Sequence, residues 1–104
     1  TLYEAHHDVV PVTYSNLPPI TADIVGPVCE TGDYLAKGRT IAGVQEGDLL
    51  SIMSAGAYGA VMASTYNSRP LIPEVLVDGD KFHVIRPRKS LDELIGMDSV
   101  PDWV

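Results

Sequence analysis

Short apolar runs separated by turn residues recur along the chain and predict strands rather than helices. Apolar positions alternate over 20–29, and the strand predicted there ends at Gly26-Pro27. The apolar run 49–53 directly follows the turn sequence of 46–48. The segment 3–14 is rich in β-favouring residues, but Pro11 interrupts it and removes a ladder donor. We therefore predict three strands, the first at a sheet edge or bulge and the third buried.

The last third of the chain carries two local signals. Runs of β-favouring residues over 71–77 and 81–86 flank an Asp-Gly-Asp sequence, and Asp-Gly between such runs is a strong hairpin signal. Ser90 is followed three positions later by Glu93, a spacing that lets the two residues satisfy N–H groups at the start of a helix. We predict a hairpin and then one short helix that ends near Gly96.

The segment 34–44 has no clear pattern, because Gly38 and Gly43 break a short mixed sequence. Helix and strand compete there, and we expect irregular structure. About five strands with many Gly and Pro turns, and no alternating helices, indicate a mainly β fold: a small β barrel or sandwich with one short C-terminal helix. The 104 residues match the size of one domain.

Composition excludes several classes of function. Seven Lys and Arg against fourteen Asp and Glu give a net charge of −7, and this negative field repels the phosphates of nucleic acids. No run approaches the roughly 18 apolar residues of a membrane span. With one cysteine and no signal-peptide pattern, we expect a cytoplasmic protein in which Cys29 stays a thiol. Because the chain starts at Thr1 without an initiator Met, we also expect a piece of a longer protein.

Two glycine-flanked segments offer candidate chemistry, and the first is GPVCETGD at 26–33. A turn fixed by Pro27 and Gly32 would hold Cys29 beside Glu30. A thiol that is mostly protonated at neutral pH suits proton delivery to a carbanion, and a carboxylate can receive an ammonium group. The alternative for Cys29 is a small buried side chain without chemistry.

The second segment is SAGAYG at 54–59. Small residues surround Tyr58, so backbone N–H groups and the phenol could approach a phosphate closely. The alternative is a tight turn plugged by an aromatic ring.

The histidines do not form a metal-binding pattern. His6 and His7 are neighbours on a predicted strand, whose side chains alternate between two faces, so they cannot bind one ion together. With one cysteine and with His83 distant in sequence, we predict no metal site.

Four segments taken together closely resemble diaminopimelate decarboxylases, in order and in spacing. They are TLYEAHHD at 1–8, DIVGPVCETGD at 23–33, EGDLLSIMSAGAYG at 46–59 and YNSRPLIPEVLVDG at 66–79. The resemblance covers nearly the whole chain and corresponds to the last quarter or so of such an enzyme, the C-terminal β domain that follows a (β/α)₈ barrel. It implies a fold-type III enzyme in which pyridoxal phosphate forms a Schiff base with a barrel lysine. The implied reaction removes CO₂ from meso-2,6-diaminopimelate and gives L-lysine.

The resemblance also implies roles for four residues. Cys29 matches a cysteine that enters the neighbouring subunit's site and protonates the carbanion after CO₂ leaves. Glu30 matches the acidic residue that contacts the distal ammonium group of the substrate. Tyr58 matches a tyrosine at the cofactor phosphate and the substrate, and Tyr3 matches one associated with the substrate carboxylate. A homodimer with shared active sites is implied, and the fragment without the barrel lysine is expected to be inactive.

Two other interpretations remain open. A related ornithine, lysine or arginine decarboxylase would share the cysteine loop, although Glu30 after Cys29 favours diaminopimelate. A non-catalytic β-barrel interaction module would keep the fold and the dimer surface without the chemistry.

Overall fold

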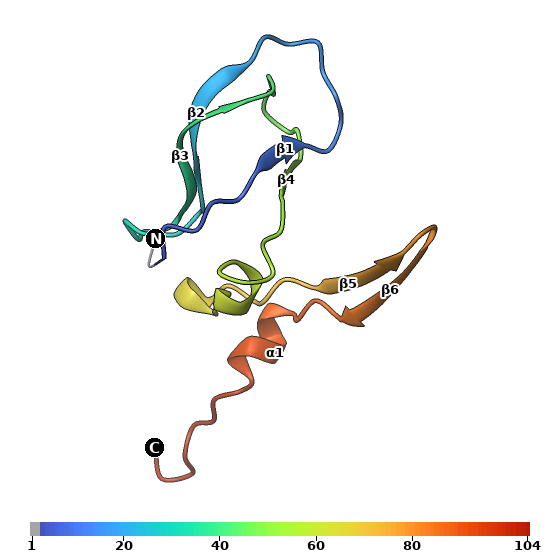
Figure 1. Ribbon diagram of the computed structural model, residues 1–104. Coiled ribbons are helices and arrows are strands. Elements are labelled where there is room, and N and C mark those ends of the chain that lie inside the picture. The colour runs from blue at the N-terminus through green and yellow to red at the C-terminus, as the bar shows by residue number, and fades with distance from the viewer. Residues whose placement is uncertain (1–2) are drawn as a thin grey trace. The chain divides into compact units, whose positions relative to one another are not determined.

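The computed structural model describes residues 3–104, which divide into two compact units with the boundary between Met62 and Ala63. Within these residues the strands pair two by two, as three antiparallel ladders: β1 with β4, β2 with β3, and β5 with β6 (Figure 1). The first two ladders belong to the first unit, 3–62, and the third belongs to the second unit, 63–104.

The elements confirm a mainly β fold with one short C-terminal helix. They are β1 (Val9–Pro11), β2 (Ile20–Val25), β3 (Tyr34–Ile41), β4 (Leu50–Ile52), the 3₁₀ turns η1 (Ala60–Met62) and η2 (Tyr66–Ser68), β5 (Glu74–Asp78), β6 (Lys81–Arg86) and α1 (Leu91–Ile95). Closure of the strands into a barrel or sandwich stays a prediction.

The ladder of β1 and β4 is shorter than the sequence pattern predicts. Only Val9–Pro11 of the segment 3–14 forms a strand, with Pro11 opposite Leu50 at one end of the ladder. The prediction of a buried strand over 49–53 is wrong in its burial, since β4 is half-buried and Leu49 before it is 70% exposed. The ladder contains three residue pairs. A ladder this short leaves the side chains next to it, such as Leu49, exposed to solvent.

The prediction of irregular structure over 34–44 is wrong, because β3 spans Tyr34–Ile41 and pairs with β2. Gly38 adopts a φ of +55° where the register shifts, and such a glycine forms a β-bulge without ending the strand. The Asp23 carboxylate accepts the Gly38 N–H at 2.6 Å. A glycine that looked like a strand breaker is therefore a bulge bonded to the facing strand.

A small core holds the two ladders of the first unit together. Val9, Ala36 and Ile41 are buried, and partly buried side chains from both ladders pack against them: Ile24, Val44, Leu50 and Ile52. Gly43 beside this core has no room for a side chain, since a Cβ there would lie 2.3 Å from the Pro18 carbonyl oxygen. The core is thus assembled from segments far apart in sequence.

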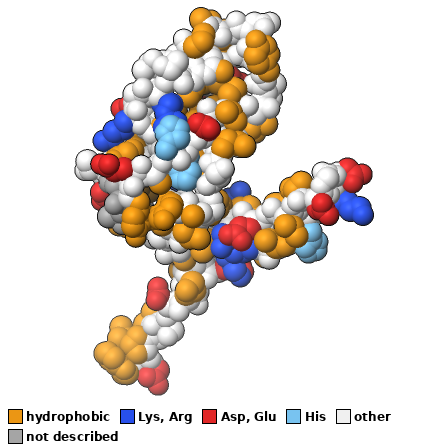
Figure 2. All heavy atoms as spheres, viewed as in Figure 1, with side chains coloured by type: hydrophobic (Ala, Val, Ile, Leu, Met, Phe, Trp, Pro, Cys, Tyr) orange, Lys and Arg blue, Asp and Glu red, His pale blue; other side chains and the backbone are white. Residues whose placement is uncertain are grey.

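The second unit forms as its local signals predict. Gly79 takes a φ of +61° in the turn between β5 and β6, and the Ser90 hydroxyl and Glu93 carboxylate form a complete capping box before α1, which Gly96 caps at its end. The hairpin starts at Glu74 rather than at residue 71. None of residues 63–104 is buried, and hydrophobic side chains lie on the surface of the hairpin (Figure 2).

Candidate functional site

The turn that carries Cys29 and Glu30 connects β2 to β3 and is organised by Asp33. The Asp33 carbonyl accepts the Gly26 N–H, and its carboxylate accepts the Val28 N–H, each at 2.8 Å. A Cβ on Gly26 would lie 2.0 Å from the Asp33 carboxylate, so only glycine leaves room for that side chain to fold into the turn. Because the Asp33 N–H also donates to the Glu30 carbonyl oxygen at 3.0 Å, Asp33 fixes the backbone on both sides of Cys29.

Both predicted reactive side chains of this turn are exposed. Cys29 is exposed, which contradicts the alternative of a small buried side chain. Glu30 is also exposed, and one carboxylate oxygen accepts the Gly32 N–H at 3.1 Å. An ionised carboxylate has about four acceptor positions, so Glu30 keeps capacity for an ammonium group. The turn thus presents a thiol and a carboxylate toward the outside of the unit.

The turn 53–59 follows β4 and holds two non-glycine residues in the left-handed region. Ser54 has a φ of +53° and Tyr58 a φ of +60°, which is uncommon for a bulky residue. The turn closes where the Ala60 N–H donates to the Ala55 carbonyl at 2.7 Å. A Cβ on Gly59 would lie 2.4 Å from that same carbonyl oxygen. Strained backbone of this kind concentrates at functional sites.

The structure brings Tyr3 and Tyr58 together from opposite ends of the first unit's sequence. Their ring centroids are 4.9 Å apart with the planes tilted by 49°, a favourable aromatic pair. Both rings remain more than half exposed. They line a cavity of about 40 Å³ together with Ala5, His7, Tyr34, Leu35 and Met62. Cys29 and Glu30 do not line this cavity, so the four predicted site residues form two groups.

The turn 53–59 has groups that could contact a phosphate from one side only. Within residues 3–104, the N–H groups of Gly56, Ala57 and Tyr58 have no backbone acceptor, and a Cβ on Gly56 would meet nothing within 4 Å. Free N–H groups and a phenol are donors that phosphate oxygens accept. The adjoining cavity of about 40 Å³ is far below the roughly 300 Å³ of a small-molecule site. This unit therefore offers one wall for a phosphate-bearing cofactor.

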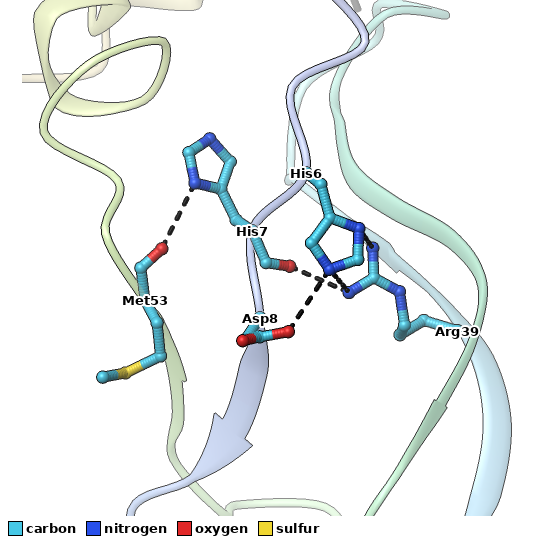
Figure 3. A network of polar contacts seen from close by, with 5 residues as sticks. All are labelled: His6, His7, Asp8, Arg39 and Met53. Carbon is cyan, nitrogen blue, oxygen red and sulfur yellow. Dashed lines mark hydrogen bonds and ion pairs between the residues drawn. The ribbon is translucent and has the colours of Figure 1, made fainter.

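His7 lies beside this wall, and sequence analysis assigned it no role. It is 8% exposed, and its Nδ1 lies 3.2 Å from the carbonyl oxygen of Met53, the residue that opens the turn (Figure 3). Its Nε2 is buried without a hydrogen-bond partner in the part of the chain described. The adjacent pair of histidines was the only sequence signal, since neighbouring side chains on an extended segment point to opposite faces.

Arg39 of β3 braces the segment before β1. Its guanidinium donates to the His7 carbonyl oxygen at 2.9 Å and lies 3.2 Å from Nδ1 of His6 (Figure 3). Nε2 of His6 lies 3.3 Å from the Asp8 carboxylate, which only accepts. The Arg39 guanidinium also lies 3.3 Å from Nε2 of His6, so a group that only donates faces both ring nitrogens, while a carboxylate that only accepts faces one of them. His6 and His7 face different partners, as the sequence predicts.

Residues 3–104 contain neither a cluster of metal-binding side chains nor a membrane-spanning helix. No three His, Cys, Asp or Glu side chains among residues 3–104 gather as a metal ion would require. No helix over the same residues is long and apolar enough to cross a bilayer.

Comparisons with known proteins agree with this geometry. Residues 1–56 match the family model described as "Pyridoxal-dependent decarboxylase, C-terminal sheet domain". The diaminopimelate decarboxylase of Zymomonas mobilis is 53% identical over 104 residues, which cover 100% of this chain and 24% of that relative. The diaminopimelate decarboxylase of Neisseria meningitidis serogroup A is 58% identical over 92 residues, 88% of this chain and 22% of that relative. The chain thus spans about a quarter of the length of these relatives.

Solved structures give the same relationship. The crystal structure of AQ1208 from Aquifex aeolicus matches with a TM-score of 0.85 and 46% identity, over 92% of this chain and 24% of that one. The diaminopimelate decarboxylase from M. jannaschi matches with a TM-score of 0.87 and 34% identity, over 98% of this chain and 23% of that one. The chain belongs to the pyridoxal-dependent decarboxylases and corresponds to their C-terminal sheet domain.

Proposed function

We propose that residues 1–104 are the C-terminal β domain of a diaminopimelate decarboxylase, which converts meso-2,6-diaminopimelate to L-lysine and CO₂. One observation carries the proposal: the whole chain is 53% identical to a protein of that name. The remaining three quarters of such a relative would contain the (β/α)₈ barrel that binds pyridoxal phosphate. The structure of a Helicobacter pylori diaminopimelate decarboxylase complexed with L-lysine, 41% identical to this chain, also supports this substrate class.

The turn 53–59 is the part of this chain that would contact the cofactor. When bound, pyridoxal phosphate supplies an electron sink for the carbon that loses CO₂. The Tyr58 phenol and the N–H groups of Gly56 and Ala57 would donate to its phosphate. The lysine that holds the cofactor would lie on the barrel, so the domain alone would have no decarboxylase activity.

The turn 26–33 would supply the proton and one substrate contact, and Tyr3 would supply another. The Glu30 carboxylate would accept the distal ammonium group of diaminopimelate, and the Tyr3 phenol would donate to a substrate carboxylate. When the bond to the departing carboxyl group breaks, the electron pair stays on that carbon. Cys29 Sγ would then transfer its proton to the carbon and recover a proton from solvent.

The separation of the four residues into two groups supports a shared site in a homodimer. Tyr3 and Tyr58 would face the barrel of their own chain. Cys29 and Glu30, exposed on a turn outside the tyrosine cavity, would enter the site of the partner subunit. A cytoplasmic enzyme of lysine biosynthesis fits a lone cysteine that must stay reduced to donate a proton.

Two alternatives are less well supported. An ornithine, lysine or arginine decarboxylase would have the same cysteine turn, but two relatives that are 53% and 58% identical to this chain are named for diaminopimelate. A non-catalytic interaction module would have no use for a thiol and a carboxylate exposed on a turn with a fixed backbone.

The proposal is tested with the full-length protein. Replacing Cys29 by Ala should lower kcat for diaminopimelate by about 10²- to 10⁴-fold, the effect of losing a general acid. Thr31→Ala, on the same exposed turn, is the matched control and should keep wild-type turnover. Release of CO₂ is measured with diaminopimelate, ornithine, lysine and arginine. A preference for one of the last three, or full activity of Cys29→Ala, would contradict the assignment.

Subunit exchange tests the shared site. Two inactive full-length variants are mixed, one without the barrel lysine and one carrying Cys29→Ala. Each hybrid dimer would contain one site with an intact lysine from one chain and an intact cysteine from the other, so activity should return. If mass spectrometry shows exchange while the mixture stays inactive, the cysteine acts within its own chain.

A further inference from the structure

We propose that His7 is a positioning residue that orients Tyr58 through one ordered water molecule bound at its Nε2. The proposal rests on the function proposed above only in giving Tyr58 a role at the cofactor. Its structural part stands on contacts within the first unit.

The contacts of the imidazole fix which nitrogen carries the proton. Nδ1 of His7 lies 3.2 Å from the Met53 carbonyl oxygen, and a carbonyl oxygen only accepts hydrogen bonds. Nδ1 must therefore be the donor, and in the neutral ring Nε2 is left as an acceptor. That acceptor is buried and has no partner among residues 3–104. Buried polar atoms in proteins are almost always satisfied by protein or by ordered water.

The cavity beside the ring has the volume and the lining that one water molecule needs. Its volume of about 40 Å³ exceeds the roughly 10–15 Å³ that accommodates a water and is far too small for a substrate. Besides His7, three tyrosines line it: Tyr3, Tyr34 and Tyr58. A buried water usually makes about three hydrogen bonds. A water that donates to Nε2 would complete its coordination with the phenols.

His7 would thus hold the turn 53–59 in two ways. Nδ1 bonds to Met53, where the chain leaves β4, and this contact fixes the start of the turn. Nε2, through the water, would fix the phenol of Tyr58, whose backbone φ of +60° leaves few side-chain orientations free of strain. The first contact places the backbone, and the second orients the reactive end of the side chain.

Two substitutions in the full-length enzyme separate these contacts. The amide nitrogen of Asn occupies the place of Nδ1, so His7→Asn keeps the bond to Met53 and removes Nε2. The amide of Gln reaches the place of Nε2, so His7→Gln keeps the water and loses the bond to Met53. We expect His7→Asn to lower kcat/KM about tenfold, the effect of one lost hydrogen bond in the transition state. His7→Gln should stay within about threefold of wild type. The opposite order, or equal values for the two variants, would overturn the proposal.

Crystal structures of the full-length protein and both variants give a readout that does not depend on turnover. Wild type and His7→Gln should contain a water about 2.7–3.2 Å from the group at the Nε2 position and from a tyrosine oxygen. In His7→Asn this water should be lost or displaced, and the Tyr58 side chain should shift. A dry cavity in wild type, or direct contact of Nε2 with another segment, would overturn the proposal. If the protein does not decarboxylate diaminopimelate and the water is present, the proposed function fails and the water site stands.

Discussion

The two units of the chain stabilise their strands by different means. In the first, 3–62, a core from four strands is buried, and the bulge at Gly38 is bonded to Asp23 on the facing strand. In the second, 63–104, no residue is buried. Its hairpin contains a tight turn and a half-buried ion pair of 2.8 Å between Glu74 and Arg86, and ion pairs that remain in contact with solvent contribute little. A substitution in the first unit should therefore destabilise residues far from it in the sequence. The effect of a substitution in the second unit should stay near the changed residue.

The largest expected effect comes from the core of the first unit. Ile41 is 5% exposed, and Ile41→Ala should lower the free energy of unfolding by about 2–4 kcal/mol because it leaves a cavity in a small core. Val84 of the hairpin is 46% exposed, and Val84→Ala should cost less than about 1 kcal/mol. Urea unfolding of the 104-residue chain, followed by hydrogen exchange of peptides from each unit, measures both. Equal costs would remove the distinction between the units.

Two glycines give the next comparison. Ala at position 43 would place a Cβ 2.3 Å from the Pro18 carbonyl oxygen, and overpacking of this kind costs about 1–3 kcal/mol. Ala at position 79 meets nothing within 4 Å but must keep a φ of +61°, at a cost of about 1 kcal/mol. Gly43→Ala should speed exchange throughout β3, whereas Gly79→Ala should affect only the hairpin. Exchange that spreads from Gly79 into the first unit would contradict a local role.

The smallest effect is a dependence of α1 on pH. Hydrogen bonds from the Ser90 N–H and from Lys89 lower the pKa of the Glu93 carboxyl below its usual value. Because the folded pKa is the lower one, this stabilisation is complete above the unfolded glutamate pKa of about 4.3 and is lost as the pH falls through the folded value. The amide proton shift of Ser90, measured by NMR, should report fraying of the helix in acid. Glu93→Gln should abolish this transition, while Asp92→Asn should keep it.

The same difference between the units decides what the sequence could predict. The hairpin turn at Gly79 and the capping box of Ser90 and Glu93 are encoded within a few residues, and both were predicted correctly. β3 was missed, because Gly38 reads as a breaker until the Asp23 carboxylate, fifteen positions away, is known to accept its N–H. Local patterns carry no information about a bond of that range.

The candidate site follows the same rule. The exposed turn of Cys29 and Glu30 could be predicted from its Gly and Pro residues. The contact of Tyr3 with Tyr58 joins the two ends of the first unit, and no local pattern encodes it. His7 was given no role because its burial and its bond to Met53 depend on a partner 46 positions away. Local sequence suggested chemistry for Cys29, Glu30 and Tyr58, whereas the role of Tyr3 came from the family resemblance alone.

The Asp33 bonds in the turn 26–33 would also bear on the kinetics and entropy of the proposed subunit assembly. Loops that become ordered when subunits meet lose conformational entropy at that moment, and this loss weakens association. Here the carbonyl and the carboxylate of Asp33 already restrain Gly26 and Val28, so the backbone around Cys29 is ordered within the monomer. Docking of this turn into a partner would then proceed as a nearly rigid-body encounter, with little reorganisation between first contact and the working arrangement.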